Sequence, residues 1–106
     1  MKYVIDIDGT ICTTTNSEYE KAEPFYDRIK KINDLYDQGH EIVFCTARGM
    51  GNSGNNPHLA RQQYYIFTAQ QLDIWGCKYH HLFLGKPSGD FYIDDKGTNS
   101  EDFFTN

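Results

Sequence analysis

The segment Lys2-Tyr3-Val4-Ile5-Asp6-Ile7-Asp8-Gly9-Thr10 joins a β-branched and aromatic run to two carboxylates, a glycine and a threonine. Its apolar residues would face both sides of a strand, which predicts a strand in the middle of a parallel sheet. Asp6 and Asp8 are anomalous there, because burying a carboxylate without a partner is costly. Residues two apart in a strand point to the same side, so both carboxylates can converge on one object. A divalent cation is a candidate, and an ordinary solvated Asp-Gly turn is the alternative.

The composition favours one globular domain spanning residues 1–106. No apolar run reaches the roughly 18 residues of a membrane helix, and the amino terminus lacks a signal-peptide pattern. We therefore expect a cytoplasmic protein without a membrane partner. The net charge of −5 argues against nucleic acid as a partner, because basic patches supply that affinity. The wide spacing of Cys12, Cys45 and Cys77 predicts reduced thiols.

Helix and strand patterns alternate along the rest of the chain. The expected elements are a helix between Pro24 and Gly39, a strand over 41–46, a helix from Asn56 to Gly76, strands over 79–84 and 91–93, and a helical turn near 100–103. Together with the first strand, they predict an α/β fold. We expect a Rossmann-like open parallel sheet of about four strands with helices on both faces.

Each predicted strand is followed by residues that can take part in chemistry. They are Asp6 and Asp8, then Thr46, then Lys86, and finally Asp94 and Asp95. The carboxyl ends of parallel strands form the ligand crevice of such a sheet, so we expect these side chains to meet. Four carboxylates, a hydroxyl and an ammonium suit metal-assisted phosphoryl transfer.

These groups resemble the four motifs of the haloacid dehalogenase (HAD) superfamily, in the same order and each at a strand end. The motif residues are Asp6-Ile7-Asp8-Gly9-Thr10, Thr46, Lys86 and Asp94-Asp95. Within that superfamily, Thr46-Ala47-Arg48 and the ending from Gly85-Lys86-Pro87 to Tyr92-Ile93-Asp94-Asp95-Lys96 are most similar to small phosphatases associated with capsular polysaccharide biosynthesis. Members carry cap domains in intervals that are short here, 11–24 and 49–56, so the resemblance implies a capless HAD-like core.

The resemblance also implies the chemistry. Asp6 would attack phosphorus and become a transient aspartyl phosphate, while Asp8 would protonate the leaving oxygen and later activate water. Thr46 would hydrogen-bond a phosphoryl oxygen, and Lys86 would neutralise the nucleophile and the developing charge. The expected enzyme is a phosphatase, a phosphoric monoester hydrolase.

The implied cofactor is Mg²⁺. Its ligands would be the Asp6 carboxylate, the backbone carbonyl of Asp8 and Asp94, with Asp95 nearby as a ligand through water or as an orienting group. Ala47 and Arg48 would join Thr46 and Lys86 in binding substrate. For Arg48 the sequence leaves two readings open: it clamps a second group of the substrate, or it pairs with a nearby acid.

We expect the substrate to be a small-molecule phosphate ester, with sugar phosphates as one class. The alternatives are a phosphatase for nucleotides or nucleic-acid ends, a receiver-like signalling module and a silent phosphate-binding scaffold. Receivers place their acid pair first and the phosphorylated aspartate in mid-chain, which this order of motifs does not match. A homo-oligomer is a further alternative, because association would cover the aromatic helix from Asn56 to Gly76 and an open cleft.

One connection fits the expected sheet badly. Only five residues, Lys86 to Asp90, follow Gly85 before the fourth predicted strand, whereas parallel crossovers usually need about a dozen. The link must be an extended loop. Either the third strand is displaced, or Lys86 approaches the site differently from its counterpart in longer family members.

Overall fold

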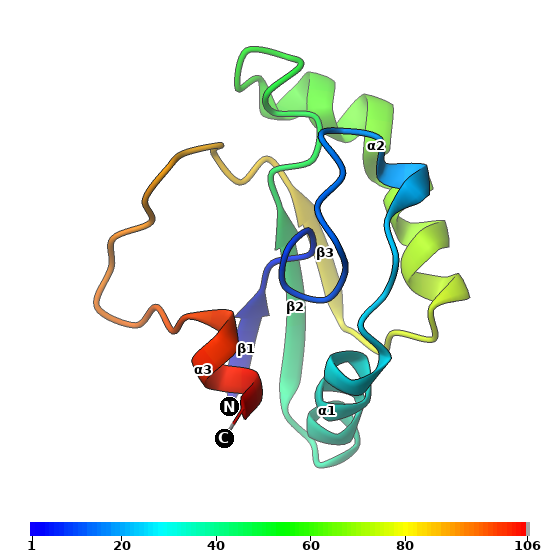
Figure 1. The fold of residues 1–106 in the computed structure, drawn as a ribbon, viewed down its shortest axis with the longest axis vertical. Coiled ribbons are helices and arrows are strands. Elements are labelled where there is room, and N and C mark those ends of the chain that lie inside the picture. Colours follow the sequence, from blue (N-terminus) through cyan, green and yellow to red (C-terminus); the bar gives the residue numbers. More distant parts are fainter. Residues whose placement is uncertain (106) are drawn as a thin grey trace.

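The structure is a computed structural model that describes residues 1–105; Asn106, the last residue of the expected domain, lies outside that range. Figure 1 shows the arrangement of its elements. In chain order they are β1 (Lys2–Ile5), the 3₁₀ turn η1 (Tyr19–Lys21), α1 (Tyr26–Asp37), β2 (Glu41–Thr46), α2 (Pro57–Ile74), β3 (His81–Leu84) and α3 (Ser100–Thr105).

The strands form an open parallel sheet in the order β1-β2-β3. Ile5 lies opposite Phe44, and Phe44 lies opposite Leu82. Helix α1 links the first two strands and α2 links the next two, so the chain is built from two successive βαβ units. The expected α/β class is confirmed, and so is the Rossmann-like arrangement of parallel strands and crossover helices.

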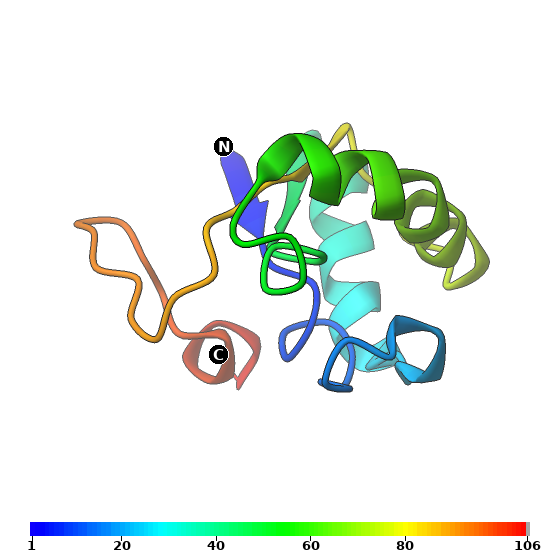
Figure 2. The same cartoon turned by 90° about the horizontal axis from the view of Figure 1, so that it is seen from above.

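The two long helices share one face of the sheet (Figures 1 and 2). The register places Ile5, Phe44 and Leu82 on that face, where they form one buried cluster with α1 and α2. Helix α1 contributes Ile29 and Ile32, α2 contributes Leu72, and Trp75 follows directly after α2. Phe104 of α3 packs against the same cluster. The expectation of helices on both faces is therefore wrong.

The second face of the sheet is partly open. Val4 is 64% exposed and Phe83 is 52% exposed, although both lie within strands. Val43 and Cys45 stand between them on the central strand, as the register requires. An apolar strip thus remains on the side away from the core cluster.

Local signals at the helix ends explain why the helix boundaries were predictable. The Asn56 side chain accepts hydrogen bonds from the backbone N–H groups of His58 and Leu59, and Pro57 occupies the first turn of α2. Gly39 and Gly76 follow α1 and α2 with φ of 94° and 75°, a left-handed conformation that favours glycine. None of the helices in residues 1–105 is long and apolar enough to span a membrane. Cys12, Cys45 and Cys77 are free thiols, as expected.

The predicted fourth strand over 91–93 does not form within the single chain. Residues 85–99 form neither strand nor helix and swing away from the sheet, as the orange segment of Figure 1 shows. The chain returns only at α3, where Glu101 pairs with Arg28 of α1 at 2.8 Å and the Phe103 ring contacts Tyr3. The physical reason is the short link after β3, which leaves 91–93 without a neighbouring strand to pair with.

Substituting Gly49 is expected to destabilise the fold. An added Cβ would lie 2.6 Å from Cδ2 of Tyr64, and φ at Gly49 is 79°. Gly49→Ala should therefore lower the free energy of unfolding by about 1–3 kcal/mol, measured by urea denaturation. Gly51→Ala is the matched control, because nothing lies within 4 Å of its added Cβ. Equal stability of the two variants would contradict the prediction.

Candidate active site

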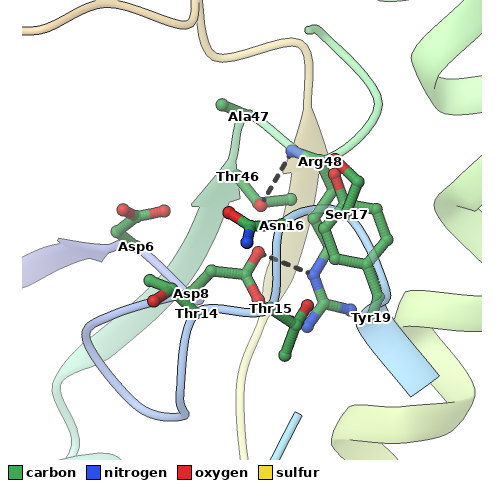
Figure 3. Close-up of a pocket in the computed structure, with 10 residues that line it drawn as sticks. All are labelled: Asp6, Asp8, Thr14, Thr15, Asn16, Ser17, Tyr19, Thr46, Ala47 and Arg48. Carbon is green, nitrogen blue, oxygen red and sulfur yellow. Dashed lines mark hydrogen bonds and ion pairs between the residues drawn. The ribbon is translucent and has the colours of Figure 1, made fainter. Parts of the chain in front are cut away.

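Polar residues gather where β1 and β2 end. Asp6 follows β1 directly, and a tight turn follows it, in which Thr10 and Ile11 donate backbone hydrogen bonds to the Ile7 carbonyl. This turn presents Asp8 beside the end of β2. The cleft between these segments has a volume of about 210 Å³ (Figure 3). Its lining residues are Asp6, Asp8, Thr14, Thr15, Asn16, Ser17, Tyr19, Thr46, Ala47 and Arg48.

Asp6 faces a cation. Its Oδ2 lies 3.7 Å from Nζ of Lys86, and its Oδ1 accepts a hydrogen bond from the Ile7 N–H at 2.8 Å. Burial raises the pKa of the Asp6 carboxyl above its ordinary value, and the Lys86 ammonium opposes that shift. The Lys86 backbone N–H donates to the Thr46 carbonyl, which fixes the lysine beside the end of β2.

Thr46 offers a hydroxyl in a buried position. It is 1% exposed, yet it lines the cleft. Its Oγ1 accepts a hydrogen bond from the Arg48 N–H at 3.1 Å, so the hydroxyl proton is left to donate elsewhere. Ala47 lines the same wall. The end of β2 therefore presents one positioned donor to the cleft.

Arg48 pairs with Asp8 on both sides of the carboxylate. Nε lies 2.9 Å from Oδ2 and a terminal nitrogen lies 3.0 Å from Oδ1, a bidentate geometry (Figure 3). The guanidinium also lies 4.7 Å from the centre of the Tyr19 ring and donates to Oγ1 of Thr68 on α2. Arg48 is 1% exposed. Of the two roles that the sequence leaves open for Arg48, the structure shows the pairing with an acid, Asp8.

Asp94 and Asp95 do not join this cleft. Both are exposed on the 85–99 segment, and the Asp94 side chain accepts hydrogen bonds from the backbone N–H groups of Lys96 and Gly97. Within residues 1–105, no three His, Cys, Asp or Glu side chains gather in a way that could hold a metal ion. Of the four carboxylates expected at the site from the sequence, Asp6 and Asp8 line the cleft, whereas Asp94 and Asp95 lie outside it.

The sequence analysis missed the polar wall formed by the loop after the first strand. Thr14, Thr15, Asn16 and Ser17 all line the cleft, and Asn16 and Ser17 have φ of 53° and 71°. Positive φ at two successive residues other than glycine is costly and is often found at binding sites. The available signal was the run Thr13-Thr14-Thr15-Asn16-Ser17, in which each side chain can donate a hydrogen bond.

A thiol also lies close to the carboxylates. Sγ of Cys12 is 3.5 Å from Oδ1 of Asp8. Burial, followed by the charge of Asp8, raises the pKa of the Cys12 thiol to about 12. Because the thiolate is the reactive form of cysteine, this raised pKa lowers the reactivity of Cys12 at neutral pH.

The chain is similar in structure to a solved protein. A crystal structure described only as an MCSG target from Vibrio cholerae matches with a TM-score of 0.89 and 29% sequence identity. The match covers 98% of this chain and 87% of that chain. The two proteins therefore share their fold over nearly the full length compared. No protein-family model matches the sequence, and no curated protein matches it.

Replacing Arg48 should weaken the fold because Asp8 would lose a bidentate partner. We expect Arg48→Lys to lower the free energy of unfolding by at least about 2 kcal/mol, since an ammonium cannot reproduce the planar two-point contact. Arg61→Lys is the matched control, because Arg61 is exposed and lies over the Tyr65 ring. Urea denaturation of both variants measures the difference, and equal losses would contradict the prediction.

The ionised Asp6 carboxylate should lower the free energy of unfolding of the metal-free protein at neutral pH. Its raised pKa means that the folded state holds this proton more tightly than the unfolded chain, so stability falls as pH rises through the interval between the two pKa values. Asp6→Asn removes that dependence. We expect the variant to have the higher melting temperature at pH 7 in EDTA, with the difference closing below about pH 4.

Differential scanning calorimetry of wild type and Asp6→Asn across this pH range measures the effect. Asp73→Asn, a change at an exposed aspartate near the end of α2, is the control. A melting temperature at pH 7 that is lower for Asp6→Asn than for wild type would reverse the expected sign.

Proposed function

We propose that this chain is a phosphomonoesterase in which Asp6 accepts the phosphoryl group. The observation that carries the proposal is the ion pair between Asp6 and Lys86 at 3.7 Å, with Asp6 lining the same cleft as Thr46. A carboxylate, a cation and a hydroxyl donor at the carboxyl ends of adjacent parallel strands are the parts that phosphoryl transfer to an aspartate uses.

In the proposed reaction an Asp6 oxygen attacks phosphorus, and the bond between phosphorus and the leaving oxygen breaks. Water then attacks phosphorus, which releases inorganic phosphate and restores the Asp6 carboxylate. Lys86 supports both steps, because its charge opposes protonation of Asp6 and offsets the negative charge of the phosphoryl oxygens. The Thr46 hydroxyl, which is free to donate, binds one of these oxygens.

Asp8 is the proposed acid and base. It protonates the leaving oxygen in the first step and takes a proton from water in the second. Because both of its oxygens accept hydrogen bonds from Arg48, Asp8 has to release at least one of these bonds to exchange a proton with substrate. Arg48 is accordingly a positioning residue that holds Asp8 at the cleft and does not itself reach the substrate.

The dimensions of the cleft favour a small substrate. Its volume of about 210 Å³ is below the roughly 300–1,000 Å³ typical of pockets for drug-sized ligands. Thr14, Asn16 and Ser17 line it with groups that can hydrogen-bond hydroxyls. A small phosphorylated metabolite rich in hydroxyls, such as a sugar phosphate, matches this lining, and the net charge of −5 counts against a long polyanion.

Mg²⁺ dependence is part of the proposal through the resemblance to the HAD superfamily. Asp6 and Asp8 are the carboxylates that one chain offers at the cleft, and the further ligands expected from the sequence, Asp94 and Asp95, lie elsewhere. The proposed steps therefore use only groups of the protein.

Phosphate release from a panel of sugar phosphates, nucleotides and p-nitrophenyl phosphate tests the proposal. We expect release with Mg²⁺, its loss in EDTA, and a loss on the order of 1,000-fold or more in Asp6→Asn. Asp73→Asn, which changes an exposed aspartate away from the cleft, should keep wild-type rates. An Asp6→Asn variant within tenfold of wild type would exclude Asp6 as the nucleophile.

A further inference from the structure

The segment after β3 exposes an apolar triplet, 91–93, that no other part of residues 1–105 covers. Phe91 is 84% exposed and Ile93 is 93% exposed. Tyr92 between them turns back on its own segment, where its hydroxyl donates to the Pro87 carbonyl and its ring lies 4.2 Å from the Lys86 ammonium. An aromatic and β-branched triplet is typical of a strand, yet here it lies in solvent.

In the part of the chain that the structure describes, the outer edges of both β1 and β3 lack a neighbouring strand, and β1 is the one that leads directly into Asp6. Within residues 1–105 the sheet ends at β1, which pairs with β2 on its other side. The amino-terminal strand was predicted to lie inside a sheet because its residues are apolar on both faces, and Val4 is instead 64% exposed. An unpaired strand edge is a ready template for an added strand.

The same chain cannot fill this edge with a parallel strand. In the register, Leu84 lies level with Ile7, because Leu84 pairs with Thr46 and Phe44 pairs with Ile5. Suppose that Phe91 began a strand beside β1, level with Tyr3. Its Cα would then lie three strand spacings across the sheet from Leu84 and about 13 Å back along the strand direction, a direct distance of about 20 Å.

The link between them is too short for that path. The six residues 85–90 separate β3 from Phe91. The seven steps from the Cα of Leu84 to the Cα of Phe91 span at most about 25 Å when fully extended. The link would also have to rise over the side chains of the sheet face and come down again, which adds roughly 5 Å at each end. The whole path from Leu84 to Phe91 is then about 30 Å. A parallel fourth strand therefore has to come from another molecule.

We propose that a second copy of this chain lays residues 91–93 along the outer edge of β1, parallel to it, and so brings its Asp94 and Asp95 to the cleft beside Asp6 and Asp8. The exchange is reciprocal, so two copies form a closed dimer with two-fold symmetry. Each copy buries its apolar triplet and completes the sheet edge of the other.

This arrangement accounts for the incomplete acidic site. A parallel strand at β1 ends at the same edge as Asp6, so the two carboxylates that follow Ile93 emerge there. The site then has carboxylates from both copies, an oxygen-rich set of the kind that hard divalent cations bind. The role of these carboxylates rests on the proposed function, whereas the strand exchange does not.

The oligomeric state tests the exchange without any assay of activity. By size-exclusion chromatography with light scattering, we expect wild type to be a dimer and Ile93→Asp to be a folded monomer, since residue 93 is almost fully exposed within one chain. Ile74→Asp changes another exposed isoleucine, 80% exposed at the end of α2, and should stay dimeric. A monomeric wild type, or a dimer lost only in Ile74→Asp, would overturn the proposal.

Complementation tests whether the second copy supplies part of the site. Asp6→Asn and Asp94→Asn should each be inactive alone. Co-expressed with different tags and purified as a heterodimer, they should recover about half of the wild-type rate, because one of the two sites then combines an intact Asp6 with an intact Asp94. Failure of the purified heterodimer to recover activity, or full activity of Asp94→Asn alone, would overturn the contribution in trans.

The two experiments separate this proposal from the proposed function. A dimer that depends on Ile93 but releases no phosphate from any compound would support the exchange and count against the phosphatase. A monomer that releases phosphate at wild-type rates after Ile93→Asp would keep the phosphatase and overturn the contribution of Asp94 and Asp95 in trans.

Discussion

The ion pair between Arg48 and Asp8 is the constraint on which the rest of the structure depends. It joins the turn after β1 to the segment after β2, and the same guanidinium contacts the Tyr19 ring and donates to Thr68 on α2. Four segments of the chain thus meet at one buried cation. Burying a guanidinium without its carboxylate costs several kcal/mol. The stability of the fold therefore depends on Asp8, a residue that also lines the cleft.

A second ion pair, between Asp6 and Lys86, lies beside the first and differs from it in exposure. The Arg48 side chain is fully enclosed, whereas about a quarter of the Lys86 side chain reaches solvent. A planar guanidinium suits a fixed bidentate contact, whereas an ammonium on a flexible four-carbon stem can change its position. Arg48 therefore holds the residues of the cleft in place, whereas Lys86 stays accessible from solvent.

The sequence predicted what local patterns determine. Period, capping and glycine positions located α1, β2, α2 and β3, and the rule that parallel strands end at one edge brought Asp6, Asp8, Thr46 and Lys86 together. It failed where the outcome depends on distant partners. Residues 91–93 read as a strand, but a strand needs an edge within reach of its link. The burial of Arg48 depends on Asp8, forty residues earlier, and no local signal reveals it.

The hydroxyl-rich loop over the cleft has a different relation to the fold. None of residues 13–17 belongs to the buried apolar cluster, and Asn16 and Ser17 adopt left-handed conformations at its tip. The cluster holds the sheet and helices together without them, while the cleft takes much of its lining from them. Ligand preference can therefore diverge in evolution by changes in this loop, at little cost to the scaffold that carries the reacting groups.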